Sequence, residues 1–167
     1  MNAILIAIGA NLPGPGLTDP HATCLAAIQS LQGLSSLNLR LISRWYRTEP
    51  MPRVPDQPDF CNGAVLMQGN PDPETLLASL HAIEAQFGRS RTVINAARPL
   101  DLDLIAIGQT VRTKSPILPH PRAHLRRFVL DPLCDIAPDW VHPLLREPVT
   151  ALRMRLMMAD PQRITLW

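Results

Sequence analysis

Two aspartates separated by one residue stand in an apolar run, Leu100-Asp101-Leu102-Asp103-Leu104. Side chains alternate along a strand, so the leucines are expected on one face and both carboxylates on the other. Neighbouring carboxylates repel each other and resist burial, and a hard divalent cation such as Mg²⁺ relieves both costs. The pattern predicts a magnesium site suited to nucleotide chemistry. An exposed edge strand with a polar face is the alternative.

Arginines and histidines flank the aspartate pair on both sides. Arginine forks bind phosphate oxygens in pairs and stabilise the charge that develops during phosphoryl transfer. The chain has neither GxxxxGK[ST] nor GxGxxG, so side chains and metal would have to hold the phosphates. The two histidines are four residues apart but have no Glu between them, which favours hydrogen bonding or phosphate contact over zinc. These candidates are Arg89, Arg91, Arg98, Arg126, Arg127, His120 and His124.

The hydrophobic pattern predicts the elements that position these residues. Strands are expected at 3–8, 37–46, 60–67 and 100–107, with an edge strand near 110–112 and a loop over 89–98. Asp19 and Asp72 are expected to cap two helices, of which the second starts at Pro73. Further helical segments are expected after residue 121 and at 128–136 and 148–158. The order β-α-β-β-α-β with appended C-terminal helices predicts a ferredoxin-like α+β fold, with an antiparallel sheet covered by two helices on one face.

Composition limits the class of protein. The chain has 167 residues, of which 46% are hydrophobic, so one domain over residues 1–167 is expected. Its net charge is only +2, and its basic residues fall in short stretches, which indicates a local anionic ligand and no nucleic-acid surface. Cys24, Cys61 and Cys134 lack zinc or dithiol spacing, so reduced thiols and a cytoplasmic location are expected. The first apolar run is too short for a signal peptide or a membrane helix.

Taken together, the motifs resemble the 6-hydroxymethyl-7,8-dihydropterin pyrophosphokinases of folate biosynthesis. The matching stretches follow the order of the family over nearly the whole chain. They are IAIGANL at 6–12, YRTEP at 46–50, QPDFCNGAV at 57–65, IEAQFGRSR at 83–91, RPLDLDLI at 98–105 and LPHPRAHLRRFVLDPLCDIAP at 118–138. The resemblance implies the ferredoxin-like fold and transfer of the β,γ-diphosphoryl group of ATP to the pterin hydroxymethyl oxygen, with release of AMP. It also implies two Mg²⁺ ions, ATP and a dihydropterin as ligands, and we expect a monomer.

The same resemblance implies roles for particular residues. Asp101 and Asp103 match the metal ligands and, with Arg91 and Arg98, the catalytic positions. The residues that match nucleotide-binding positions are His81, Glu84, Arg89, Arg98, His120 and Arg126. Those that match pterin-binding positions are Phe60, Asn62, Asp101 and Phe128. From the residues alone, Phe60 and Phe128 are more simply core aromatics, and the general base stays unassigned.

One stretch departs from the family pattern. Where the family commonly has Trp-Gly-Pro-Arg, this chain has Asn95-Ala96-Ala97-Arg98 in a loop about one residue shorter. That loop closes over the substrates in the family, so a pterin-binding protein with weakened catalysis is one rival hypothesis. An RNA-binding module is another, because ferredoxin-like sheets also present aromatics to RNA. The aliphatic strands and the paired aspartates argue against RNA.

Overall fold

Across the residues that the structure describes, 1–89, 97–159 and 162–167, the computed structural model contains one six-stranded antiparallel sheet and four α-helices. The strands are β1 (Asn2–Ala10), β2 (Leu37–Ile42), β3 (Tyr46–Thr48), β4 (Phe60–Gly69), β5 (Asp101–Ile107) and β6 (Ile164–Leu166). The helices are α1 (Pro20–Gln32), α2 (Pro73–Gln86), α3 (Arg127–Ile136) and α4 (Val149–Ala159), with one 3₁₀ turn, η1 (Ala123–Leu125). The mixed class with an antiparallel sheet is as predicted.

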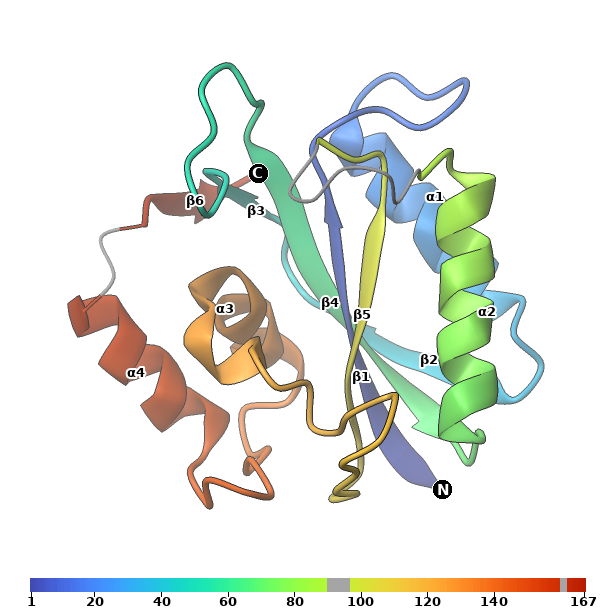
Figure 1. The fold of residues 1–167 in the computed structure, drawn as a ribbon, viewed down its shortest axis with the longest axis vertical. Coiled ribbons are helices and arrows are strands. Elements are labelled where there is room, and N and C mark those ends of the chain that lie inside the picture. Colours follow the sequence, from blue (N-terminus) through green and yellow to red (C-terminus); the bar gives the residue numbers. More distant parts are fainter. Residues whose placement is uncertain (90–96, 160–161) are drawn as a thin grey trace.

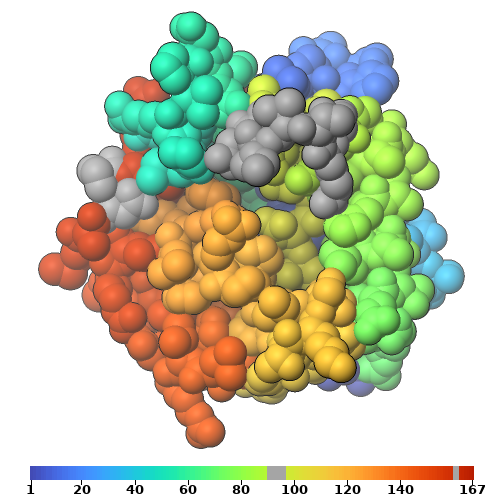
Figure 2. All heavy atoms as spheres, viewed as in Figure 1, coloured from blue at the N-terminus to red at the C-terminus, as the bar shows by residue number. Residues whose placement is uncertain are grey.

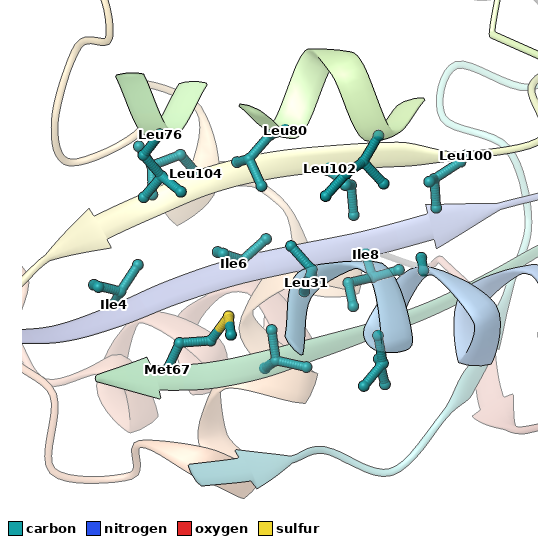
Figure 3. Packing of buried hydrophobic residues seen from close by; sticks show 14 of the residues in the cluster. Ile4, Ile6, Ile8, Leu31, Met67, Leu76, Leu80, Leu100, Leu102 and Leu104 are labelled. Atoms are coloured by element: carbon teal, nitrogen blue, oxygen red, sulfur yellow. The ribbon is translucent and has the colours of Figure 1, made fainter. Parts of the chain in front are cut away.

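The sheet separates two hydrophobic layers. Its strand order is β5-β1-β4-β3-β6, and β2 also pairs with β4. Figure 1 shows α1 and α2 on one side of the sheet and α3 and α4 on the other. Ile4, Ile6 and Ile8 of β1 join the first layer, which Figure 3 shows from close by, whereas Leu5 and Ala7 join the second. Because both faces of β1 are covered, its sequence is continuously apolar.

The two capped helices begin where the sequence predicts. The side chain of Asp19 accepts a hydrogen bond from the Ala22 N–H at 2.8 Å, and Asp72 accepts one from the Thr75 N–H at 2.9 Å. These bonds satisfy donors that the first turn of a helix leaves without partners. Gly88 follows the end of α2 with φ of 83°, a left-handed conformation in which glycine avoids strain. None of the helices in the described ranges is long and apolar enough to cross a bilayer.

The single strand predicted over 37–46 is wrong, because the chain leaves the ladder between β2 and β3. The Ser43 side chain accepts a hydrogen bond from the Ala64 N–H at 2.8 Å, while the Ser43 backbone N–H donates to the Ala64 carbonyl at 2.9 Å. Next to it, the Arg44 side chain makes an ion pair with Asp135 of α3, 2.6 Å away. Polar side chains thus interrupt the strand by bonding outside it, and an alternating pattern does not reveal such bonds.

At the edges of the sheet, one predicted strand is absent from the described residues and one strand was missed. No strand forms at 110–112, where Arg112 and Leu118 make only an isolated bridge. Conversely, β6 was not predicted, because its three residues pair with β3, which lies more than a hundred residues earlier. A strand this short carries too little local pattern to be found without its partner. The loop expected over 89–98 lies mostly outside the described residues.

Candidate active site

The paired aspartates lie on β5, next to the central strand β1. Asp101 is opposite Gly9, and Asp103 is opposite Ala7. The alternate leucines of β5 pack toward α2, where Leu80 meets them (Figure 3). The aspartate side chains lie on the other face and are 26% and 29% exposed. Although β5 is at an edge of the sheet, its carboxylates are enclosed by charged neighbours and do not form a simple solvated face.

Asp101 is surrounded by the arginines that precede it. One of its carboxylate oxygens contacts the guanidinium of Arg89, and the other accepts a hydrogen bond from Arg98 at 3.1 Å. Arg89 also contacts Glu84 of α2, whose side chain is only 2% exposed. Glu84 in turn accepts a hydrogen bond from the Leu102 backbone N–H at 2.8 Å. This network joins α2 to the start of β5 and concentrates charge at one point.

Asp103 has more distant cationic neighbours. Nε2 of His120 and Nη1 of Arg126 each lie 3.9 Å from its carboxylate. Burial and the charge of Asp101 raise the pKa of Asp103 to about 6, although Arg126 opposes this. Burial, assisted by Arg126 and Arg122, lowers the pKa of His120 to about 4. His120 is therefore neutral at pH 7, and its contact with Asp103 is no salt bridge.

The hydrogen bond at one ring nitrogen of His120 determines which nitrogen carries the proton of the neutral ring. Nδ1 accepts a hydrogen bond from the Arg122 backbone N–H at 3.2 Å, so the ring proton is on Nε2. The backbone of His120 is held by a 2.8 Å hydrogen bond to the Ile105 carbonyl of β5. His120 thus presents an N–H donor beside Asp103, suited to an anionic oxygen.

A cleft of about 280 Å³ opens over these residues. Its charged and polar wall comes from α2, β5 and the turn before η1, and residues 115–117 form the facing wall. In Figure 2, the yellow atoms of β5 show between the green atoms of α2 and the orange atoms of α3. The predicted site residues that line the cleft are His81, Glu84, Arg89, Asp101, Asp103 and His120.

A second half of the site lies across β1. Gly9 is opposite Asp101 on β5 and also opposite Asn62 on β4, so the three residues form one row across three strands. Side chains in such a row point to the same face, and the outer two strands are about 10 Å apart. A methyl group at Gly9 would lie 2.6 Å from Oδ1 of Asn62. Glycine therefore allows the Asn62 amide to lie over β1, in the same row as Asp101.

Aromatic residues on β4 and α3 complete the set of predicted pterin-binding residues. Asn62 is 7% exposed, and its Nδ2 donates to Oγ1 of Thr48 at 2.6 Å, which orients the amide. Phe60 begins β4 and Phe128 lies in the first turn of α3, and both are half-buried. The guanidinium of Arg126 lies 5.5 Å from the ring centre of Phe128. Phe128 also packs against the second hydrophobic layer, so a core role and the predicted pterin contact both stay open for the two rings.

Asn11 is a site residue that sequence reasoning missed. It is 1% exposed, and its Oδ1 accepts a hydrogen bond from the Arg98 N–H at 2.8 Å. Its Nδ2 donates to the Pro58 carbonyl at 3.1 Å. Asn11 therefore ties the segment that carries Arg98 to the proline-rich loop before Asn62. The signal in the sequence was an Asn directly after an apolar strand.

Several predicted residues are not brought into the site. Arg127 points toward Asp131, 3.2 Å away, and His124 packs 5.5 Å from the ring of His142. Arg127 turns away because it is one residue after Arg126. His120 and His124 do not share a helix face because the 3₁₀ turn covers only Ala123–Leu125. Arg91 lies outside the described residues, so its predicted catalytic role stays a prediction.

The carboxylates meet the requirements of Mg²⁺. Mg²⁺ takes one or two carboxylates and completes its shell with phosphate oxygens and water. Asp101 and Asp103 supply hard oxygens on one face, and the excess negative charge that raises the pKa of Asp103 is what a divalent cation neutralises. Within the described part of the chain, no three His, Cys, Asp or Glu side chains gather as a metal cluster. The donor set therefore fits magnesium that is shared with phosphate.

A family model for 7,8-dihydro-6-hydroxymethylpterin-pyrophosphokinase matches residues 5–138. The chain belongs to this family. It is therefore a pyrophosphokinase, an enzyme of folate biosynthesis that acts on hydroxymethyldihydropterin. The family assignment agrees with the resemblance of the sequence motifs.

Named relatives support the assignment. A 2-amino-4-hydroxy-6-hydroxymethyldihydropteridine pyrophosphokinase of Synechocystis sp. is 39% identical over 140 residues, which are 83% of this chain and 68% of the relative. An enzyme of the same name from Pseudomonas aeruginosa is 34% identical over 137 residues, which are 81% of this chain and 81% of the relative. The wild-type Plasmodium falciparum HPPK-DHPS, solved with SDX-DHP, superposes with a TM-score of 0.67 at 14% identity over 96% of this chain. The chain spans only 45% of that solved chain, and this likeness shows the fold alone.

Proposed function

We propose that the chain transfers the β,γ-diphosphoryl group of ATP to the hydroxymethyl oxygen of 6-hydroxymethyl-7,8-dihydropterin and releases AMP. The observation that carries this proposal is the row of Asn62, Gly9 and Asp101 across three strands. In this row, an amide suited to a pterin ring and the first residue of the carboxylate pair share one face of the sheet. The cleft, which Arg89 and both aspartates line, adjoins the Asp101 side of this row.

The charged residues in and around the cleft would have different roles. Asp101 and Asp103 would hold magnesium, with two ions expected, and bound magnesium supplies neutralisation of phosphate charge. Arg89 and Arg98, which now pair with Asp101, would exchange that partner for phosphate oxygens. His120 donates from Nε2 to the same oxygens, and Arg126 adds charge beside Asp103. The residues position and neutralise, and no covalent intermediate is needed.

Two walls would receive the substrates. His81 and Glu84 line the α2 side of the cleft, where the nucleotide would lie. Asn62, held by Thr48, would hydrogen-bond the polar edge of the pterin, and Phe60 and Phe128 would cover its flat faces. Asp101 borders both halves and is placed to meet the reacting oxygen. No side chain is assigned as general base.

The proposal includes a finer description of the protein. The strand order β5-β1-β4, with β2 and β3 both against β4, supports a ferredoxin-like arrangement of the sheet. The described structure leaves Cys24, Cys61 and Cys134 as free thiols, which supports a reducing, cytoplasmic location. A monomer is the state proposed.

The deciding experiment is a coupled assay for AMP release from ATP and Mg²⁺, with and without 6-hydroxymethyl-7,8-dihydropterin. AMP is expected only with the pterin, and the Asp101→Ala/Asp103→Ala double variant should release none. Turnover in the double variant would refute the metal assignment. Pterin binding without any AMP from the wild type would leave a pterin-binding protein with lost catalysis as the better description.

A further inference from the structure

A buried glutamine near the end of the chain connects two parts of the molecule that border the pterin half of the site. Gln162 is 5% exposed, and its Nε2 donates to the Glu49 backbone carbonyl at 2.9 Å. The next residue, Arg163, donates its backbone N–H to Oε1 of Glu49 at 2.9 Å. Both bonds hold the residue at which β3 passes into the proline-rich loop.

Glu49 directly follows the residue that orients Asn62. Thr48 is 1% exposed and accepts the 2.6 Å hydrogen bond from the Asn62 amide. Thr48 is also opposite Ile164 in the pairing of β3 with β6, which Figure 1 shows side by side. The position of the Asn62 amide therefore depends on a three-residue strand whose outer neighbour is the C-terminal segment.

The backbone of the same glutamine is held from α3. Nη1 of Arg127 donates to the Gln162 carbonyl at 3.2 Å, while Nη2 of Arg127 makes an ion pair with the buried Asp131. Asp131 also pairs with Arg153 of α4. Arg127 lies between Arg126 and Phe128 in the chain, so the residue next to the proposed pterin-stacking ring is tied to Gln162.

We propose that Gln162 is a positioning residue for the dihydropterin: it holds Thr48 and Glu49 on one side and α3 on the other at a fixed separation. This inference rests on the proposed function, because the two sides it joins are those assigned to the pterin. Gln162 is not among the described residues that line the cleft. Its side-chain amide donates to the Glu49 carbonyl, while its backbone carbonyl accepts from Arg127, so one residue is bonded to both sides.

Gln162→Glu tests the idea, since it keeps the shape of the side chain and removes the donor to Glu49. Gln162→Met removes the same donor without adding charge, and it serves if the glutamate variant fails to fold. Gln109→Glu is the matched control, because Nε2 of Gln109 also donates to a backbone carbonyl, that of Val141, at 3.1 Å on an exposed part of the chain. Thermal unfolding reports the fold of each variant.

The readout is the KM for each substrate, measured separately. In a folded Gln162 variant the KM for dihydropterin should rise about 5- to 30-fold, because the Asn62 amide is no longer held in position, with the KM for ATP changed less than about twofold. Gln109→Glu should change neither. An unchanged pterin KM in both folded Gln162 variants, or equal rises for both substrates, would overturn the inference. A wild type without turnover or pterin binding would overturn the proposed function itself and this inference with it.

Discussion

Replacing Asp103 by Asn should stabilise the metal-free protein while abolishing its activity. The carboxylate is held next to Asp101 and largely buried, which raises its pKa from the ordinary 3.8 to about 6. At 1.36 kcal/mol per pKa unit, this difference corresponds to about 3 kcal/mol of destabilisation by the ionised form. Because 29% of the side chain is exposed, screening by water reduces the expected gain to about 2 kcal/mol.

The gain should depend on pH in a defined direction. A carboxyl with a raised pKa in the folded state binds a proton more tightly there than in the unfolded chain, so its contribution to stability falls as pH rises from about 3.8 through about 6. Asn cannot ionise and escapes this loss. The difference between Asp103→Asn and the wild type should therefore be near zero at pH 4 and complete above pH 7.

Urea unfolding in EDTA at pH 4 and pH 8 measures both values. At pH 8 the variant should be about 2 kcal/mol more stable in urea, and in a separate thermal scan it should melt roughly 4 to 8 °C higher than the wild type. The exposed Asp139→Asn is the control and should change stability by less than about 0.5 kcal/mol. The reasoning is refuted if Asp103→Asn is no more stable at pH 8, or if its gain is the same at both pH values.

Three other substitutions test the packing around the site. Gly9→Ala puts a methyl group 2.6 Å from the Asn62 amide oxygen, so it should displace the amide. Calorimetry should then show dihydropterin binding weakened at least tenfold, about 1.4 kcal/mol. Unaltered affinity would contradict the proposed role of Asn62 in pterin binding. Leu80→Ala empties a fully buried position between α2 and β5 and should cost about 2–5 kcal/mol in urea unfolding, and a cost well under 1 kcal/mol would argue against that packing. Asp131→Ala leaves Arg127 without its carboxylate and should cost about 3–5 kcal/mol by the same method; a neutral result would show that the ion pair does not hold α3.

Local patterns were sufficient for the elements with strong periodicity. The alternation around Asp101 and Asp103 predicted which face of β5 carries the carboxylates, because the period of a strand depends only on its backbone. Asp19 and Asp72 marked the helix starts for a similar reason, since a cap bonds within its own turn. The motifs that resemble the family predicted the reaction type, and the match over residues 5–138 bears that out.

The sequence pattern could not predict the directions of individual side chains or their partners on distant segments. Arg126 and Arg127 are neighbours, yet only Arg126 lies beside Asp103, because one residue along the chain turns a side chain away from the site. The break of the chain between β2 and β3 depends on Ser43 bonding to Ala64 of another strand. The role of Gln162 depends on Glu49, more than a hundred residues earlier.

The sequence by itself determined the class of chemistry, because carboxylates, arginines and an amide can be recognised by type and spacing alone. Tertiary structure decided which of them meet. Gly9 stands between Asn62 and Asp101 only because β1 pairs with β4 on one side and β5 on the other, in one register. Register follows from burying the alternate side chains of three strands at once, and a slip of one residue would turn each side chain to the opposite face. That cooperative burial is a property of the whole sheet and of no single segment.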